Sequence, residues 1–357
     1  MKVAIVIGTR PEIIKLSPVI RVLEKREIDF FILHTGQHYS YDLNWIFFQQ
    51  LGLPDPKYNL NIGSHSPGRQ VAKIIAGVET VLVSEQPDVV LVLGDTNSVF
   101  AGAFVASKLG LTVGHIEAGL RSYDRNMPEE INRILTDHCS DLLFAPTEEA
   151  VTILKGEGIS ENVFMTGNTI VDAVYQNLPR AKGLAREAFV LPEQYFLATV
   201  HRAENVDNRS RFLAVIQSLQ AVAETWKVKV FYPIHPHAIS KIKEFGISLQ
   251  GLDILPPVDY LHFLDLEKSA LAVLTDSGGV QEEACILGTP CVALRDNTER
   301  PETITVGSNV LVGVEPRRIL EGLDYMLNKN NHWRNPFGDG KAAERIVDVL
   351  EKLDGRD

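Results

Sequence analysis

Acidic side chains follow two apolar stretches of the chain, at the points where the stretches end. Asp95 comes after the run Val89–Leu93, and Glu117 comes directly after Leu111–Ile116. Such runs predict buried parallel strands, whose carboxyl ends meet at one edge of a sheet. Carboxylates held close together raise each other's pKa, so one can stay protonated as a general acid while another accepts a proton. The pattern indicates proton-transfer chemistry, although Asp95 could instead cap a helix and Glu117 could pair with Arg121.

Two further acids, Glu129 and Glu130, follow Pro128 at a predicted helix start. Acids at this position interact favourably with the positive end of the helix dipole, which would account for both without any catalytic role. Their segment is nevertheless expected at the same sheet edge as Asp95 and Glu117. Glu129 and Glu130 are therefore further candidates for proton transfer.

Cations lie at the first predicted strand–helix turn. Gly8-Thr9-Arg10-Pro11 follows the apolar run Lys2–Ile7, and Lys15 comes within about one helical turn. A helix N-terminus with cations beside it is a natural anion site, so Arg10 and Lys15 are candidate phosphate ligands. Surface charge on an amphipathic helix is the alternative. The polar stretch Arg295–Glu302 offers further arginines for a phosphate, or is a surface loop.

The second half of the chain offers two more candidate segments. His201 follows the apolar run Tyr195–Val200, and a histidine can donate to a phosphate or accept a proton near neutral pH. Ser277, Gly278 and Gly279 follow another predicted strand, where their backbone N–H groups suit a phosphate, and Glu283 lies one turn further on, within reach of sugar hydroxyls. A loop histidine bonded to backbone and a simple helix cap are the alternatives.

Alternating strands and helices are predicted to position these residues. Strands are expected at 2–7, 30–33, 89–93, 111–116, 142–145 and 163–165, and then at 195–200, 228–233, 252–255, 271–275, 290–294 and 310–312. Such series predict an α/β protein with two doubly wound, Rossmann-like domains and a cleft between them. The link is expected between about 168 and 192, which gives domains 1–170 and 171–339. The last helix, about 340–357, is expected to pack back on the first domain.

Composition narrows the classes of function. The 357 residues suit two domains, and the net charge of −11 gives no general attraction for nucleic acid or an anionic membrane. Cys139, Cys285 and Cys291 form no paired motif, and no apolar stretch approaches a membrane span, so a reduced, cytoplasmic protein is expected. No GxGxxG or Walker loop follows a strand, which argues against a nicotinamide-dependent enzyme or an ATPase.

The histidines outside these segments have weaker claims. His235-Pro236-His237 has the spacing of some metal pairs, but no further ligand completes a set, so no metal is expected. His34, His38 and His115 are predicted at strand ends, where they could line the cleft.

Eight short motifs occur in the order GTRPEIIK (8–15), TGQH (35–38), GDTNS (94–98), HIEAGLRS (115–122), PEEINR (128–133), HRAEN (201–205), TDSGGVQEEA (275–284) and TERPE (298–302). Through them the chain resembles the non-hydrolysing UDP-N-acetylglucosamine 2-epimerase family over essentially its whole length. The resemblance implies a fold like that of GT-B glycosyltransferases, with the active site in the interdomain cleft. It also implies a homodimer that needs no cofactor.

The activity implied by the resemblance is the reversible epimerisation of UDP-GlcNAc to UDP-ManNAc. The C2 proton is removed and UDP is eliminated to give 2-acetamidoglucal, and UDP then adds back while C2 is protonated from the opposite face. The resemblance implies that Asp95, Glu117 and Glu129 are the catalytic carboxylates, without deciding which is base and which is acid. It places His201 near the diphosphate, where it could assist departure of UDP. The substrate-binding residues that it implies are Arg10, Lys15, Arg133, Phe263 (whose backbone meets uracil), Ser277, Gly278, Gly279 and Glu283 (which holds the ribose).

Two departures from the family pattern bear on the substrate and its regulation. The connection from Glu117 to Glu129 looks slightly shorter than the common bacterial version, so a UDP-2,3-diacetamido-2,3-dideoxy-glucuronate substrate is an alternative. A GT-B glycosyltransferase, a nucleotide-sugar sensor and a hydrolysing epimerase are further alternatives.

Gln37 and Arg69 match part of a site at which a second substrate molecule activates some family members, but Tyr39-Ser40 replaces the expected Arg and Gln. The same activation is therefore not expected.

Overall fold

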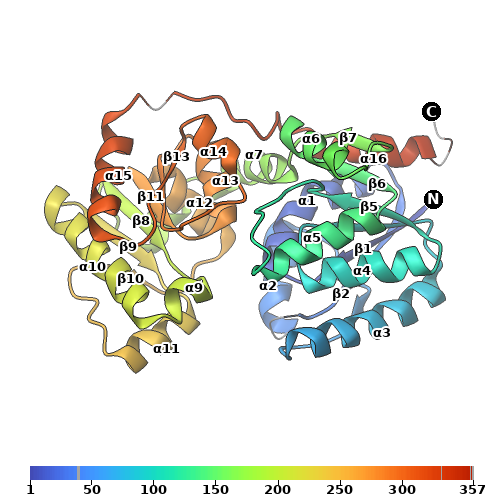
Figure 1. The fold of residues 1–357 in the computed structure, drawn as a ribbon, viewed down its shortest axis with the longest axis horizontal. Helices are drawn as coiled ribbons and strands as arrows, with labels where there is room; N and C mark the ends of the chain where they lie inside the picture. Colours follow the sequence, from blue (N-terminus) through green and yellow to red (C-terminus); the bar gives the residue numbers. More distant parts are fainter. Residues whose placement is uncertain (38–40, 331, 354, 356–357) are drawn as a thin grey trace. The chain divides into compact units, whose positions relative to one another are not determined.

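The chain divides into two compact units, each built on a parallel sheet (Figure 1). The computed structural model describes residues 1–37, 41–330, 332–353 and 355, without the side chains of residues 41–44. Unit 1 comprises Met1–Tyr175 with Phe337–Asp357, and unit 2 comprises Gln176–Pro336.

Unit 1 contains a seven-stranded sheet in the order β3-β2-β1-β4-β5-β6-β7. Its strands are β1 Lys2–Ile7, β2 Asp29–His34, β3 Tyr58–Asn59, β4 Val89–Leu93, β5 Thr112–Ile116, β6 Leu142–Ala145 and β7 Val163–Met165. The central strands are buried on both faces, as their unbroken apolar runs predict. The direction of winding reverses between β1 and β4. Arg10 follows β1 and Asp95 follows β4, so both lie where a doubly wound sheet binds its ligand.

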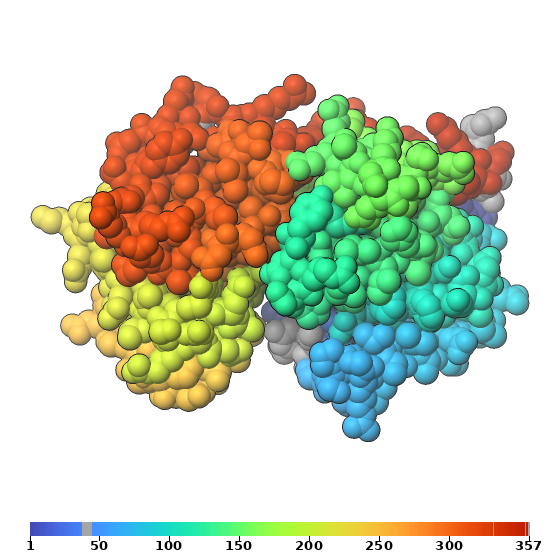
Figure 2. Space-filling view, in the orientation of Figure 1, coloured from blue at the N-terminus to red at the C-terminus, as the bar shows by residue number. Residues whose placement is uncertain are grey.

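The helices of unit 1 are α1 Arg10–Lys25, α2 Tyr41–Leu51, α3 Pro67–Glu85, α4 Asn97–Lys108, α5 Pro128–Cys139, α6 Glu148–Gly156, the first part of α7 Thr169–Ala181, and α16 Ala342–Leu353. Figure 2 shows α3, α4 and α5 side by side on one face of this unit. The C-terminal helix α16 packs against α1, where Arg26 pairs with Asp348 at 2.7 Å and with Glu351 at 2.5 Å. Asp172 of α7 accepts hydrogen bonds from the first backbone N–H groups of α16, so residues far apart in sequence complete this unit.

Unit 2 contains a six-stranded sheet in the order β10-β9-β8-β11-β12-β13. Its strands are β8 Tyr195–Thr199, β9 Lys229–Pro233, β10 Asp253–Leu255, β11 Ala272–Thr275, β12 Cys291–Ala293 and β13 Asn309–Leu311. Its helices after α7 are α8 Leu184–Ala188, α9 Ala203–Val206, α10 Arg209–Trp226, α11 Pro236–Phe245, α12 Tyr260–Ser269, α13 Gly278–Leu287, α14 Pro301–Thr305 and α15 Pro316–Asn328. Winding reverses between β8 and β11, the strands that precede His201 and Ser277.

The two doubly wound parallel sheets confirm the predicted fold class, and several elements differ from the prediction. The stretch 168–192, predicted to be a link, is largely helical, with Pro179 inside the last turn of α7. The prediction missed α15, although Ile319, Leu323 and Met326 are buried at helical spacing. It also missed β3, α9 and α14, which are two, four and five residues long, because periodicity cannot develop over such lengths.

Candidate active site

Glu117 lies directly after β5, and the side chains of Lys15 and Asn168 contact its carboxylate. Lys15 Nζ, from α1, lies 2.5 Å from Glu117 Oε1, and Asn168 Nδ2 donates to the same oxygen at 3.1 Å. Glu117 and Lys15 are each 6% exposed, so the ion pair is largely shielded from water. The φ of Glu117 is 71°, which lies in the left-handed region. This conformation is unfavourable for a residue other than glycine, and it often marks a functional site. Arg121 pairs with Asp137 and Glu157, so its predicted alternative pairing with Glu117 was wrong.

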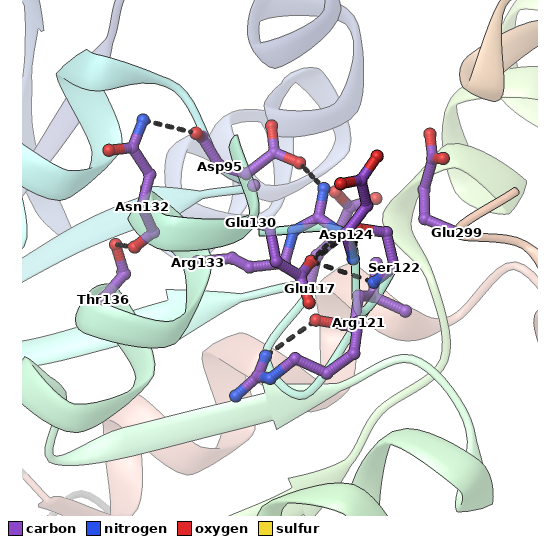
Figure 3. Close-up of polar contacts among 12 residues, drawn as sticks. Asp95, Glu117, Arg121, Ser122, Asp124, Glu130, Asn132, Arg133, Thr136 and Glu299 are labelled. Carbon is purple, nitrogen blue, oxygen red and sulfur yellow. Dashed lines mark hydrogen bonds and ion pairs between the residues drawn. The ribbon is translucent and has the colours of Figure 1, made fainter. Parts of the chain in front are cut away.

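Asp95 lies after β4 and pairs with Arg133 of α5 (Figure 3). The same guanidinium donates to Glu130 Oε2 at 2.9 Å, so Arg133 joins two carboxylates. Asn132 Nδ2 donates to the backbone carbonyl of Asp95 at 3.0 Å, which fixes the loop before α4. Thr96, and not Asp95, caps α4 by accepting a hydrogen bond from Val99 N. The Asp95 side chain is 31% exposed and is more open to a ligand than Glu117.

The adjacent acids at the start of α5 have different environments. Glu130 is 1% exposed and accepts hydrogen bonds from Ser122 N at 2.9 Å, Ser122 Oγ at 2.9 Å and Tyr123 N at 2.8 Å. It therefore anchors the loop that follows Glu117. Glu129, one residue earlier, is exposed. Sequence alone could not distinguish these roles, because both acids suit the first turn of a helix.

Arg10 opens α1 beside a buried acid. Its guanidinium carbon lies 5.0 Å from the centre of the Phe47 ring. Glu12 Oε2 accepts the backbone N–H groups of Gly8 at 2.5 Å and Thr9 at 3.3 Å, so this side chain shapes the turn that carries Arg10. Burial raises the pKa of Glu12 to about 7. A Cβ at Gly8 would lie 2.0 Å from Ser98 Oγ, so only glycine fits this turn.

A chain of hydrogen bonds connects Gln37, one of the two residues matched to an activator site, with the Asp95 loop. Gln37 Oε1 accepts from Ser98 Oγ at 2.6 Å, and Gln70 Nε2 donates to the Gln37 carbonyl at 2.8 Å. Gln70 Oε1 accepts from Asn97 at 2.8 Å, and Asn97 Oδ1 accepts from Asn132 at 3.1 Å. Arg69 is exposed on the first turn of α3. His38, Tyr39 and Ser40 lie outside the described residues.

In unit 2, His201 is oriented by Asp276. The His201 Nδ1 atom lies 3.2 Å from Asp276 Oδ1, while the imidazole side chain is 47% exposed. Asp276 is fully buried and also accepts hydrogen bonds from His201 N at 3.1 Å, Arg202 N at 3.1 Å and Asn205 Nδ2 at 3.1 Å. Burial alone would raise the pKa of Asp276, but His201, Asn205 and the backbone N–H of Arg202 hold it below its ordinary value. A carboxylate bonded to one ring nitrogen of a histidine fixes the orientation of the ring, so that the other nitrogen is available to a ligand.

The turn before α13 is shaped by glycines. Ser277 is the N-cap of α13, and its Oγ accepts from Val280 N at 3.5 Å. A Cβ at Gly278 would lie 2.4 Å from Glu299 Oε1, whereas a Cβ at Gly279 would meet nothing closer than Ser277 Oγ at 4.0 Å. Gly278 is therefore required by the neighbouring Glu299. Gly279 leaves backbone accessible at a helix N-terminus, where an anion is favoured.

Arg295 lies behind this turn and is fully buried. Its Nη2 lies 2.8 Å from Glu299 Oε2, and Arg300 Nε lies 2.5 Å from Glu282 Oε1. The stretch Arg295–Glu302 thus contains a buried ion-pair network. Its Asp296 and Asn297 are exposed, so the stretch is a surface loop whose arginines are buried.

Glu283 and Phe263 occupy the helices α13 and α12. Glu283 is 7% exposed and lies near the fully buried Glu267, whose pKa is raised by burial and by the charge of Glu283. The ring of Phe263 packs against the apolar core of unit 2, and its backbone N–H donates to the Asp259 carbonyl at 2.9 Å. This N–H is therefore engaged within the helix.

Comparisons with known proteins identify the family of the chain. The family model for UDP-N-acetylglucosamine 2-epimerase matches residues 21–351. A UDP-N-acetylglucosamine 2-epimerase from Methanocaldococcus jannaschii is 55% identical, over 98% of this chain and 99% of the relative. The chain belongs to the UDP-N-acetylglucosamine 2-epimerase family. The resemblance seen in the sequence is thereby confirmed.

A solved structure and a further relative support the same assignment to the epimerase family. The crystal structure of the M. jannaschii UDP-GlcNAc 2-epimerase in complex with UDP-GlcNAc and UDP has a TM-score of 0.94 at 54% identity, covering 99% of this chain and 100% of that one. A UDP-2,3-diacetamido-2,3-dideoxy-D-glucuronate 2-epimerase from Pseudomonas aeruginosa is 41% identical, over 99% of this chain and all of the relative. A spinosyn rhamnosyltransferase, at 12% identity and a TM-score of 0.53, shares the fold alone.

Within this epimerase-family chain, the candidate residues form two groups. Unit 1 brings together Asp95, Glu117, Lys15 and Arg133, with Arg10 and Glu129 on adjoining segments, while unit 2 carries His201, Ser277, Gly278, Gly279, Glu283 and Phe263. His34 and His115 are buried, so the expectation that they line a cleft was wrong. Sequence reasoning missed the roles of Asp276, Asn168 and Glu130, whose contacts depend on the folded chain.

Among the described residues, no three His, Cys, Asp or Glu side chains are grouped to hold a metal ion. The described helices include none with the length and apolarity to cross a membrane.

Proposed function

We propose that this protein catalyses the reversible epimerisation of UDP-GlcNAc to UDP-ManNAc at C2. The observation that carries the proposal is the pair of ion-paired carboxylates, Asp95 and Glu117, after adjacent strands of a chain 54% identical to an enzyme crystallised with UDP-GlcNAc and UDP. Preorganised charges at a sheet edge can act where charge develops in a transition state. The chain's membership of the epimerase family supports the same reaction.

The proposed reaction proceeds by elimination and re-addition. One carboxylate removes the C2 proton while the C1–O bond to UDP breaks, which leaves 2-acetamidoglucal and UDP. UDP then adds back to C1, and a second acid delivers a proton to the opposite face of C2. Asp95, Glu117 and Glu129 share these two proton transfers. Lys15 and Arg133 hold Glu117 and Asp95 in place by the ion pairs described above.

Unit 2 is assigned to the UDP part of the substrate. His201, oriented by Asp276, donates a hydrogen bond to the diphosphate and assists its departure. The N-terminus of α13, with Ser277, Gly278 and Gly279, binds phosphate oxygens, and Arg10 of unit 1 adds a cation. Glu283 accepts hydrogen bonds from the ribose hydroxyls, and the backbone of Phe263 contacts uracil through groups other than its N–H. The reaction needs no redox cofactor and no metal, and the protein acts as a cytoplasmic homodimer.

A second substrate has a specific observation in its favour. The P. aeruginosa relative that acts on a UDP-2,3-diacetamido-2,3-dideoxy-D-glucuronate aligns over all of its length at 41% identity. The segment from Glu117 to Glu129, held by Glu130, is the part of the chain in which the substituents of the sugar would be distinguished.

The proposal is tested by supplying both nucleotide sugars to the purified protein. Anion-exchange chromatography of the UDP-GlcNAc reaction should give UDP-ManNAc, without free ManNAc. Release of free ManNAc and UDP would instead identify a hydrolysing epimerase. Turnover of the diacetamido glucuronate alone would establish the second substrate, and transfer of the sugar to an acceptor would indicate a glycosyltransferase.

A further inference from the structure

A buried histidine joins the two strands that precede Asp95 and Glu117. His115 of β5 is fully buried, with its Nδ1 atom 2.7 Å from Asp137 Oδ1 and its Nε2 atom 2.9 Å from the Gly94 carbonyl oxygen. A carboxylate and a backbone carbonyl are acceptors only. Both bonds to these acceptors form together only when each ring nitrogen carries a hydrogen, as in an imidazolium.

Asp137, the partner of His115, also bonds to two other residues. Asp137 of α5 is fully buried, accepts Gly119 N at 3.2 Å and pairs with Arg121 Nη1 at 2.7 Å. Arg121 continues to Glu157, with Nε to Oε1 at 2.8 Å and Nη2 to Oε2 at 2.5 Å. Burial alone would raise the pKa of Asp137, but His115 and Arg121 lower it below its ordinary value. The network contains two positive and two negative groups, so a charged His115 is balanced inside the fold.

The contacts of this network fall on the backbone beside both candidate catalytic acids. Gly94 immediately precedes Asp95, has a φ of 89° and donates its N–H to the Ile116 carbonyl at 3.0 Å. Gly119 lies two residues after Glu117 and has a φ of 83°, and a Cβ there would lie 2.4 Å from the Ala150 carbonyl. Both turns are therefore tightly constrained. The His115–Asp137 pair is bonded to each of them.

We propose that His115, acting as an imidazolium with Asp137, is a positioning residue that holds the Asp95 and Glu117 backbone segments in one fixed arrangement. The inference rests on the proposed function of these two acids. A neutral His115 has one ring N–H and would lose one of its two bonds. One of the two segments would then be free to move, and misplacement of about 1 Å at a catalytic group costs up to roughly a hundredfold in rate.

Two substitutions test the positioning role. In His115→Gln both donor hydrogens are on one amide nitrogen, which cannot take the place of two ring nitrogens that face Asp137 and Gly94 separately. In Asp137→Asn the charge that balances the imidazolium is lost. Both variants should lower kcat by about tenfold or more, with KM and the Kd for UDP within about twofold, because the UDP contacts are elsewhere. His65→Gln is the matched control and should keep the wild-type kcat, since this histidine of unit 1 is exposed and its ring contacts Lys73 of α3, outside the network.

A purely structural histidine would give a different result. In that case His115→Gln would lower Tm while the folded protein kept its kcat, and this outcome would overturn the proposal. A crystal structure of the His115→Gln variant should also show the Gly94 carbonyl or the Gly119 turn displaced from its wild-type position. Unchanged positions at both turns would equally overturn it.

The charge state is measured independently of activity. Long-range 1H–15N NMR on wild-type protein labelled at histidine should show both nitrogens of His115 protonated at pH 7, identified by the signal that is lost in His115→Gln. If that variant does not fold, the signal that changes in Asp137→Asn identifies the ring. A singly protonated His115 would overturn the inference even in an active enzyme. If the wild-type protein epimerises neither nucleotide sugar, the proposed function fails, while the NMR and crystallographic results still decide the positioning of the two turns.

Discussion

At the scale of single residues, burial separates acids that look equivalent in the sequence. Glu117 is enclosed with Lys15, Asp95 is partly open beside Arg133, Glu130 is enclosed by loop donors, and Glu129 faces solvent. Lys15 and Glu117 are 102 residues apart in the chain, so no local pattern could predict their contact. The sequence identified which residue types could transfer a proton. Only the folded chain shows what holds each of them.

Removing the charge of each candidate acid tests its role in proton transfer. Asp95→Asn, Glu117→Gln and Glu129→Gln should each lower kcat by about 10²- to 10⁴-fold, because a positioned acid or base contributes that much. Calorimetry should show that UDP still binds each variant, since its contacts are assigned to unit 2 and to Arg10, which these substitutions leave unchanged. Glu161→Gln, at an exposed position of unit 1, is the control and should keep wild-type kcat. Wild-type turnover in all three variants would refute the assignment.

The neighbouring glutamates of α5 should separate catalysis from stability. Glu130→Ala removes the acceptor for Ser122, Tyr123 and Arg133 and should cost about 3 kcal/mol or more in the free energy of unfolding. Glu129→Ala should leave that free energy within about 0.5 kcal/mol, because substitutions at exposed positions rarely change it more. Urea unfolding of both variants measures the difference. Equal losses of stability would contradict the separate environments of these residues.

At the scale of elements, the sequence predicted most of the strands and the helices between them. Unbroken apolar runs such as Val89–Leu93 are reliable signals of buried parallel strands, and all the chemistry-bearing motifs lie after strands or at helix starts, as expected. The helices α9 and α14 and the two-residue strand β3 escaped prediction because they are too short to show a period. The stretch around Pro179 was predicted to be a link because the composition loosens between Pro179 and Pro192, whereas Pro179 lies in the final turn of α7.

The buried acid at the start of α1 should make stability depend on pH. Burial raises the pKa of Glu12 to about 7, whereas the unfolded chain has an ordinary glutamate pKa near 4.5. Between these values the native state binds more protons than the unfolded state, so stability falls as pH rises through this window and levels off above it. The free energy of unfolding should fall by up to about 1.4 kcal/mol per pH unit relative to Glu12→Gln. Urea titrations of both proteins from about pH 5 to about pH 8 measure the slope, and parallel curves would contradict it.

At the scale of the whole molecule, two units of similar design carry different halves of the proposed chemistry. Unit 1 supplies the carboxylates and unit 2 supplies the glycine turn and the oriented histidine. The sequence predicted that the last helix packs back on the first domain, but it could not predict the contacts of α16. The ion pairs of Arg26 with Asp348 and Glu351 join residues more than 300 positions apart. The family assignment rests on nearly the full length of the chain.

The proposed homodimer has a simple test. The helices α3 and α5 of unit 1 carry exposed apolar side chains, among them Val83 at 57% and Leu135 at 42%. Association would remove such side chains from water. Sedimentation equilibrium should give twice the chain mass of 39.6 kDa. A monomer mass at micromolar concentration would refute the dimer.

The central claim is that the carboxylates of unit 1 exchange a proton at C2 of UDP-GlcNAc. Proton NMR of the protein with UDP-GlcNAc in D2O tests it most directly. Signals of UDP-ManNAc should grow while deuterium replaces the proton at C2 in both sugars, because the abstracted proton exchanges with solvent before it returns. Folded protein that gives neither UDP-ManNAc nor C2 exchange would contradict the account, and would make the diacetamido glucuronate the next substrate to supply.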